Sequence, residues 1–158
     1  MISRRPFLAA AVMFAARPAL AQSGPQPELP KEALAIVTRG GKRHDFAVEM
    51  ALTPDQQTVG LMFRPIVPPN GGMLFDWGAE RSSQMWMRNT IASLDMIFIG
   101  EDGRIRTIVE RTVPQSLAII DSKVEVRATL EVAAGTCLRL DISVGDRVMH
   151  PMFLVRPG

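Results

Sequence analysis

The stretch DMIFIGEDGRIRTIVE, residues 95–110, decides the fold class, because it places two short apolar segments on either side of a Gly-Glu-Asp-Gly link. An Asp-Gly pair is favoured in the tight turns of β-hairpins. We therefore expect residues 95–99 and 104–110 to form neighbouring antiparallel strands. A link this short leaves no room for a crossover helix, so the stretch indicates an antiparallel sheet.

Segments of the same kind continue on both sides of this hairpin. Short apolar segments separated by turns lie at residues 73–77, 85–88, 117–120, 124–132 and 147–153, and a predicted hairpin at residues 33–38 and 44–52 flanks a Gly-Gly turn. No internal repeat and no second domain is evident in the sequence. The pattern predicts a mainly β fold, a single compact antiparallel sandwich or partly closed barrel with one or two short helices.

One helix is predicted directly after the first hairpin. Thr53-Pro54-Asp55-Gln56 supplies an N-cap hydroxyl, a proline at the first helical position and a glutamine three residues after the cap. Pro65 disfavours helical geometry at the residue before it. We expect the helix to end by Phe63.

The first 21 residues have the pattern of an export signal. Arg4 and Arg5 precede an apolar stretch, and Ala19-Leu20-Ala21 forms a small-residue cleavage site. We predict a signal peptide at residues 1–21, cleaved after Ala21, and a periplasmic or secreted protein that meets the export machinery through this segment. The paired arginines resemble a twin-arginine signal of bacteria, and an ordinary secretory signal is the alternative. The apolar stretch is about half the ~20 residues that a membrane-spanning helix needs, so we expect no permanent membrane anchor.

Residues 22–30 hold three prolines and one glycine, which predicts a flexible lead-in. Residues 31–158 then form a single β-rich domain. Three arginines lie in the predicted leader, and its removal leaves 15 of the 18 basic residues against 16 acidic residues. The sequence therefore argues against a nucleic-acid partner, which would require a basic face that persists after processing.

Four polar residues follow or interrupt apolar blocks, and these are Arg64, Asn89, Thr90 and Asp95. A buried carboxylate must find a cation or several amide donors. Asp95 lies between apolar neighbours, and Arg64 is the guanidinium in the most comparable setting. We predict that these two side chains meet. The alternative is that the four residues merely tie loops to the sheet.

Trp86 and Glu131 complete the candidate site. By alternation, Glu131 lies on the polar face of the predicted strand 124–132, which is either a solvated face or the polar wall of a groove. Trp86 shares a strand face with Gln84 and Arg88. That position suits a sugar-stacking platform or a rim residue over the core.

The order of several blocks along the chain carries a resemblance. The blocks are GLMFR at 60–64, GGMLF at 71–75, WMRNT at 86–90, Leu94-Asp95 through Phe98-Ile99, LEVAAG at 130–135 and GDRV at 145–148. Together they resemble the bacterial and archaeal family of domains of unknown function numbered 192. The resemblance implies a compact, mainly β fold of jelly-roll character and no established activity. Asp141 stands where the family commonly has glycine, so the turn conformation there is an open question.

Two functions from different classes remain open. The first is a non-catalytic binding or accessory domain for a small polar or carbohydrate-like ligand, in a groove lined by Arg64, Trp86, Asn89, Thr90, Asp95 and Glu131. The second is a periplasmic hydrolase or lyase that uses the Asp95 and Glu131 carboxylates as acid and base. We favour the first, because neither histidine lies in these blocks and a serine nucleophile needs a base within reach.

Copper binding is a minor alternative. Met149, His150 and Met152 offer thioether and imidazole ligands that suit monovalent copper. Zinc and calcium ligand patterns are absent from the sequence, and we expect no cofactor. Cys137 is the only cysteine, and its neighbours predict a structural role.

Overall fold

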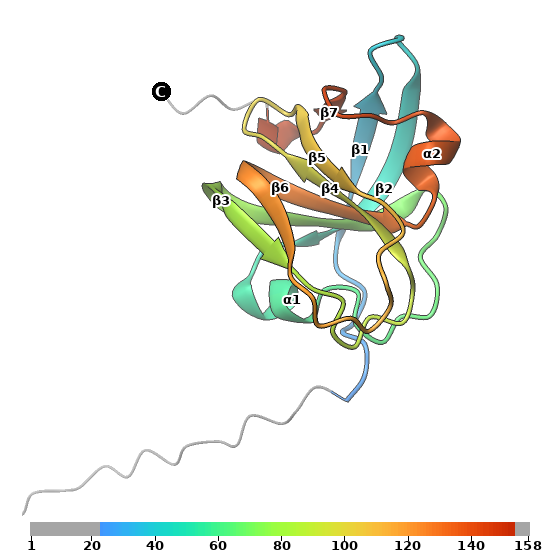
Figure 1. Cartoon of the computed structure of the whole chain (residues 1–158), viewed down its shortest axis with the longest axis vertical. Helices are drawn as coiled ribbons and strands as arrows, with labels where there is room; N and C mark the ends of the chain where they lie inside the picture. Colours follow the sequence, from blue (N-terminus) through green and yellow to red (C-terminus); the bar gives the residue numbers. More distant parts are fainter. Residues whose placement is uncertain (1–22, 154–158) are drawn as a thin grey trace, which may run out of the picture.

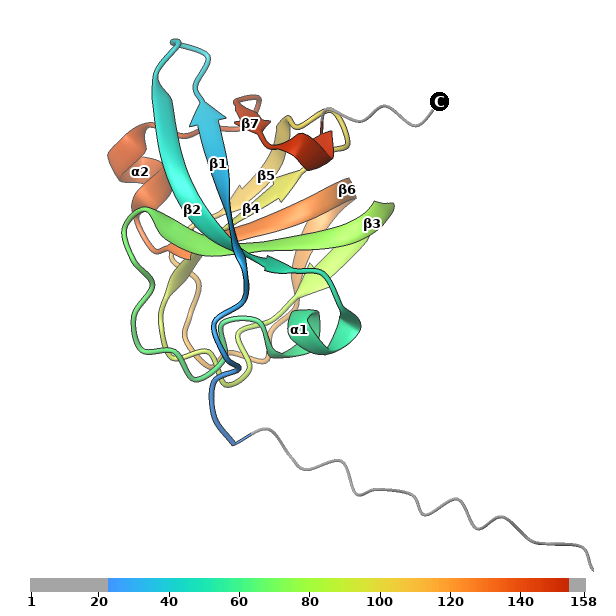
Figure 2. The same cartoon turned by 180° about the vertical axis from the view of Figure 1, so that it is seen from behind.

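The computed structural model describes residues 23–153, which form one strongly curved sheet with short helices (Figures 1 and 2). Its strands are β1 (Lys31–Val37), β2 (Arg43–Ala51), β3 (Gly71–Met85), β4 (Leu94–Ile99), β5 (Ile105–Val109), β6 (Ile120–Ala133) and β7 (Arg147–Met149). The helices are α1 (Pro54–Val59), α2 (Thr136–Leu140) and a 3₁₀ turn, Pro151–Phe153. No helix in this part of the chain is long and apolar enough to cross a membrane.

The strands are ordered β5-β4-β6-β3-β2-β1-β7. Every neighbouring pair is antiparallel except β2 and β3, which run parallel. The two edges of the sheet approach each other, because Arg104 and Arg147 form a bridge and the Val148 amide donates to the Gly103 carbonyl at 2.7 Å. The sheet is therefore curled into a partly closed barrel.

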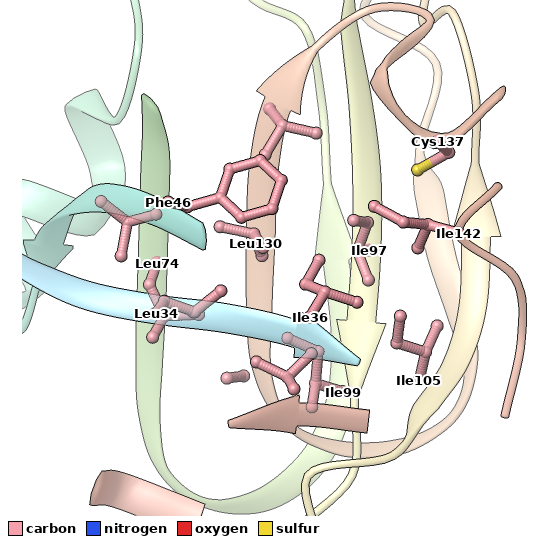
Figure 3. Close-up of a cluster of buried hydrophobic side chains, with 14 of the residues drawn as sticks. Leu34, Ile36, Phe46, Leu74, Ile97, Ile99, Ile105, Leu130, Cys137 and Ile142 are labelled. Carbon is pink, nitrogen blue, oxygen red and sulfur yellow. The ribbon is translucent and has the colours of Figure 1, made fainter. Parts of the chain in front are cut away.

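Apolar clusters cover both faces of the sheet. The cluster in the concave interior includes Leu34, Ile36, Phe46, Leu74, Ile97, Ile99, Ile105 and Leu130 (Figure 3). The second cluster, on the other face, includes Met73, Phe75, Met87, Leu94, Met96 and Phe98. Successive side chains of a strand point to opposite faces, so β4 supplies alternate residues to the two clusters.

Local signals explain where α1 begins and ends. The Thr53 hydroxyl accepts from the Gln56 amide, and the Gln56 side chain accepts from the Thr53 amide, which completes a capping box. The helix ends at Gly60, whose φ of 50° favours glycine. The predicted start is confirmed, and the end lies within the predicted limit.

The mainly β fold and the partly closed barrel are confirmed, as are the hairpins β1–β2 and β4–β5. The expectation of a wholly antiparallel sheet is wrong for one pair, because residues 52–70 lead the chain back before β3 begins beside β2. The predicted segment 73–77 and Met85 belong to one long strand, β3, whose pairing with β6 shifts register between Asp76 and Arg81. Residues 86–88, predicted as part of a strand, lie in the loop after β3. At Asp141 the turn is left-handed, with φ of 58°, although glycine is absent.

The predicted lead-in is held against the domain over its second half. Gln26 donates its side-chain amide to the carbonyls of Gln56 and Gly60, and Leu29 packs against the second cluster. The predicted signal peptide, residues 1–21, lies outside the described residues, as do residues 154–158.

Candidate functional site

A row of side chains crosses one face of the sheet and carries two buried acids. Register pairs Glu49 of β2 with Met73 of β3, Met73 with Glu131 of β6, and Glu131 with Met96 of β4. Paired residues share a face. Both glutamates are 4% exposed, and two strand spacings, about 10 Å, separate their backbones.

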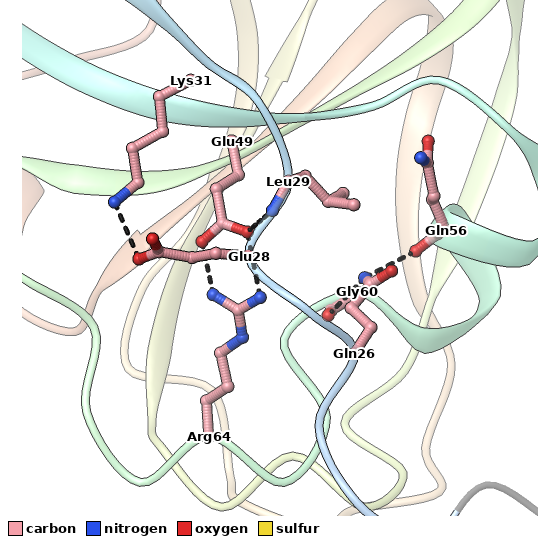
Figure 4. A network of polar contacts seen from close by, with 8 residues as sticks. All are labelled: Gln26, Glu28, Leu29, Lys31, Glu49, Gln56, Gly60 and Arg64. Atoms are coloured by element: carbon pink, nitrogen blue, oxygen red, sulfur yellow. Dashed lines mark hydrogen bonds and ion pairs between the residues drawn. The ribbon is translucent and has the colours of Figure 1, made fainter.

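Glu49 is neutralised by Arg64 (Figure 4). The guanidinium binds both carboxylate oxygens, with Nη2 at 2.9 Å from Oε2. The Leu29 amide also donates to Oε2, at 2.8 Å. A bidentate pair with an added amide donor satisfies a buried carboxylate, so this cluster ties the loop after α1 and the lead-in to β2.

Glu131 has no such partner. Among residues 23–153, no side chain or amide donates to its carboxyl group, and no cation pairs with it. Its register neighbours Met73 and Met96 are fully buried. Burial raises the pKa of Glu131 from 4.5 to about 8, because the charged form loses its hydration without replacement. The group is largely protonated at neutral pH.

A small pocket of about 30 Å³, partly open to solvent, lies against Glu131. The lining residues come from α1, the turn after it, β3 and the loop after β3: Gln57, Thr58, Val59, Gly60, Leu61, Met62, Phe75, Met85, Trp86 and Thr90. Its volume lies far below the 300–1,000 Å³ that is typical of pockets for drug-sized ligands, so it admits only a group of a few atoms.

Gln57 positions the helix that walls this pocket. Its side-chain nitrogen donates to the carbonyl of Ala51 at 3.1 Å and to that of Asp76 at 2.7 Å. These two bonds attach α1 to the end of β2 and to the middle of β3. The pocket is therefore bounded by a helix with a fixed position over the sheet.

Three of the six predicted site residues meet at this pocket: Trp86, Thr90 and Glu131. Trp86 is 40% exposed at the rim, and the guanidinium carbon of Arg88 lies 5.4 Å from its ring centroid. Thr90 is buried, and its hydroxyl donates to the Arg88 carbonyl at 3.2 Å. Trp86 therefore borders both the pocket and solvent.

Asn89 and Arg64 lie beside the pocket without lining it. The Asn89 side chain donates to the sulfur of Met62 at 3.9 Å, and its backbone carbonyl accepts from the Phe63 amide. Its φ of 54° is left-handed, a conformation that asparagine tolerates better than most residues. Arg64 borders a different hollow, which Glu28, Lys31 and Glu49 also line.

The predicted pairing of Arg64 with Asp95 is wrong. Asp95 is fully buried and accepts hydrogen bonds from the backbone amides of Arg111, Gly135 and Cys137, at 2.9, 3.0 and 2.9 Å. Three amide donors satisfy the carboxylate without a cation. Arg64 instead takes Glu49, which the sheet places within its reach.

Asp95 and Glu131 cannot act as an acid–base pair at one site. Asp95 is in register with Val132, and Glu131 with Met96. These two pairs are adjacent along β4 and β6, so their side chains point to opposite faces of the sheet. The hypothesis of a hydrolase or lyase that uses both carboxylates therefore loses its geometric basis.

Of the copper candidates Met149, His150 and Met152, the histidine is already in contact with protein groups. His150 is buried, its Nδ1 accepts from the Met152 amide at 3.3 Å, and its Nε2 lies 3.0 Å from Glu32. Met152 packs against the interior cluster. Within residues 23–153, no three side chains of His, Cys, Asp or Glu are placed to hold a metal ion.

Sequence reasoning missed Glu49 and Gln57. Glu49 was detectable in principle, because it is the one acid between Ala47 and Leu52, a mostly apolar stretch of its strand. Gln57 carried no signal, since an exposed helical glutamine has the same pattern as one that binds two carbonyls.

The chain is similar to a family of proteins and to solved structures from other bacteria. The model of one protein family, DUF192, described as uncharacterized ACR, matches residues 35–150. A crystal structure from Sinorhizobium meliloti, named for a proposed role as a transcription regulator, is 48% identical with a TM-score of 0.77, over 78% of this chain and 96% of that one. A protein of unknown function from Novosphingobium aromaticivorans is 35% identical with a TM-score of 0.73, over 86% of this chain and 94% of that one. No curated protein matches the chain.

Proposed function

The chain belongs to the DUF192 family, and from its pocket we propose that it is a non-catalytic binding domain for a small polar ligand. One observation carries the proposal. Glu131 is a buried acid that lines a pocket and has no partner among the described residues. Burying a polar group without a hydrogen bond is costly, and a ligand that bonds to Glu131 would offset this cost.

The proposed setting is outside the cytoplasm. The pattern of residues 1–21 supports export through the twin-arginine or the general secretory route, and hence a periplasmic or secreted protein. Nucleic acid is not part of the proposal, because the charge of the chain after its leader is nearly balanced.

A thermal-shift screen tests the binding function. The purified domain is heated with sugars, cell-wall fragments and other small polar compounds, because a compound that binds the folded state raises the melting temperature. We expect at least one compound to raise it, and Trp86→Ala to reduce that shift. A screen without any shift contradicts the proposal, as does a shift that is unchanged in both Trp86→Ala and Glu131→Gln.

A further inference from the structure

Three loops at one end of the molecule carry most of its exposed apolar side chains. They are residues 60–70, 86–93 and 111–119, and Figures 1 and 2 show them together, below the sheet and beside α1, at the end where the described chain begins. Of the ten large apolar side chains that are exposed in the described part of the chain, six belong to these loops: Ile66, Trp86, Ile91, Val113, Leu117 and Ile119. Exposed apolar side chains gathered in this way mark a surface for a partner.

Backbone hydrogen bonds join the middle loop to both of the others. Its Asn89 carbonyl accepts from the Phe63 amide of the first loop at 2.8 Å, and two bonds of 3.0 Å join it to Ser116 and Gln115 of the third loop. These backbone groups are paired within the protein, which lowers the cost of moving the loops out of water.

The three loops carry positive charge. Their ionisable residues are Arg64, Arg88 and Arg111, and they hold no aspartate, glutamate, lysine or histidine. Arg64 is neutralised by Glu49, which leaves two exposed arginines. The neighbouring acids lie on or directly after other elements, namely Asp55 on α1, Glu110 directly after β5, and Asp121 and the exposed Glu125 on β6.

We propose that the three loops bind the surface of a membrane that contains anionic lipids. Their apolar side chains bury surface at the boundary between headgroups and acyl chains, a depth at which tryptophan is enriched. Arg88 and Arg111 pair with the negative headgroups there. A second copy of the chain fits less well, because it would bring together two sets of loops with the same positive charge.

The course of the chain favours a membrane over an acidic protein as the partner. The described chain begins at the same end as the three loops, so residues 1–21, the predicted export signal, join the domain there. An export signal brings its protein to a membrane, and the loops then face that membrane. This step rests on the export proposed above, whereas Val113, Leu117 and Ile119 of the third loop are not part of the Glu131 pocket.

Co-sedimentation with lipid vesicles tests the proposal. The protein used is residues 22–158, because the predicted leader is itself apolar and both apolar clusters of the fold lie within residues 23–153. We expect it to bind phosphatidylglycerol vesicles, to bind neutral phosphatidylcholine vesicles at least about tenfold more weakly, and to be released by added salt.

Leu117→Asp should lose at least about tenfold in affinity for phosphatidylglycerol vesicles, because it removes an apolar contact and adds a charge that the lipid repels. Leu138→Asp on α2 is the matched control, since both leucines are 68% exposed, and it should stay within about twofold of the wild type. The double variant Arg88→Gln and Arg111→Gln should also lose about tenfold. Circular dichroism checks that each variant is folded.

Contrary results overturn the proposal in distinct ways. Absence of binding to phosphatidylglycerol vesicles overturns it, as do equal binding to both lipids and equal losses in Leu117→Asp and Leu138→Asp. Self-association that Leu117→Asp abolishes, without lipid binding, overturns it and assigns the loops to a second copy of the chain. The ligand of the Glu131 pocket is tested separately by the thermal-shift screen, so failure of one proposal leaves the other standing.

Discussion

Two carboxylates on neighbouring strands show how the local environment decides what a buried acid does. Asp95 and Glu131 are both buried, and both lie among apolar side chains. Asp95 accepts three backbone amides, so its negative charge is stabilised by the fold itself. Glu131 has no donor among the described residues, so burial acts on it alone. The first acid is a structural tie, and the second remains available to a ligand.

The stability of the protein should depend on pH through Glu131. The folded-state pKa of about 8 lies above the ordinary value of 4.5, so the folded protein keeps a proton that the unfolded chain releases. This contribution to stability is present below pH 4.5 and is lost as the pH rises to 8. As the pH rises through this window, we expect the free energy of unfolding of Glu131→Gln to increase relative to that of the wild type, by up to about 4 kcal/mol.

Urea unfolding at the two ends of this window measures the difference in the free energy of unfolding between Glu131→Gln and the wild type. Glu125→Gln serves as the control and should give the same difference at both pH values. A difference for Glu131→Gln that does not grow with pH would contradict the buried, raised pKa.

Among the elements, α1 is a short helix whose stability and position depend on contacts made by its ends and side chains. Six residues make few internal hydrogen bonds, so the helix relies on its capping box and on Gln57 to stay over the pocket. The lead-in adds a third attachment through Gln26, which binds the Gly60 carbonyl at 2.9 Å. The wall of the pocket is thus built from contacts outside the helix.

Thr53→Ala should destabilise the domain by about 1 kcal/mol, because it removes the hydroxyl that caps the Gln56 amide. Chemical denaturation measures this change. Thr58→Ala is a matched control in the same helix. Thr58 is exposed and donates only to the Pro54 carbonyl, so alanine should change stability by less than about 0.5 kcal/mol. Equal losses in the two variants would show that the cap does not hold α1.

For the whole molecule, closure of the barrel depends on contact between its two edges. Ile105 exchanges backbone hydrogen bonds with the segment before β7, donating to Asp146 and accepting from Gly145, each at 2.9 Å. The Asp146 carboxylate accepts from the amides of Arg39 and Ser143, at 2.9 and 2.7 Å. These contacts close the interior cluster at the edge of β5.

Gly103→Ala should weaken the contact between the two edges of the sheet. A Cβ at Gly103 would lie 2.7 Å from the Val148 carbonyl oxygen, and the φ of +76° already disfavours alanine. We expect a loss of about 3 kcal/mol or more, measured by thermal unfolding. Gly41→Ala is the control, because its φ of +83° is similar but a Cβ there meets nothing within 4 Å. Its loss should be about 1 kcal/mol, from backbone strain alone.

Local sequence patterns were enough to predict the class of fold, the first hairpin, the Asp-Gly hairpin and the start of α1. These features follow from alternation of apolar residues and from turn and cap residues that act over a few positions. Of the six residues predicted to line a groove, Trp86, Thr90 and Glu131 line the pocket, whereas Arg64, Asn89 and Asp95 do not. The partner of Arg64 could not be predicted from the sequence, because Glu49 and Asp95 both lie among apolar neighbours, and the acid chosen, Asp95, is the wrong one.

Which acid lacks a partner could be learned only from the folded arrangement of the strands. That outcome depends on the register between β3, β4 and β6, which places Asp95 and Glu131 on opposite faces, and on the parallel pairing that brings Glu49 to Arg64. Register and strand order join residues that lie far apart along the chain, and a shift of one residue would exchange the two faces. Local patterns carry the propensity of each segment, whereas the partner of a buried charge depends on which segments meet.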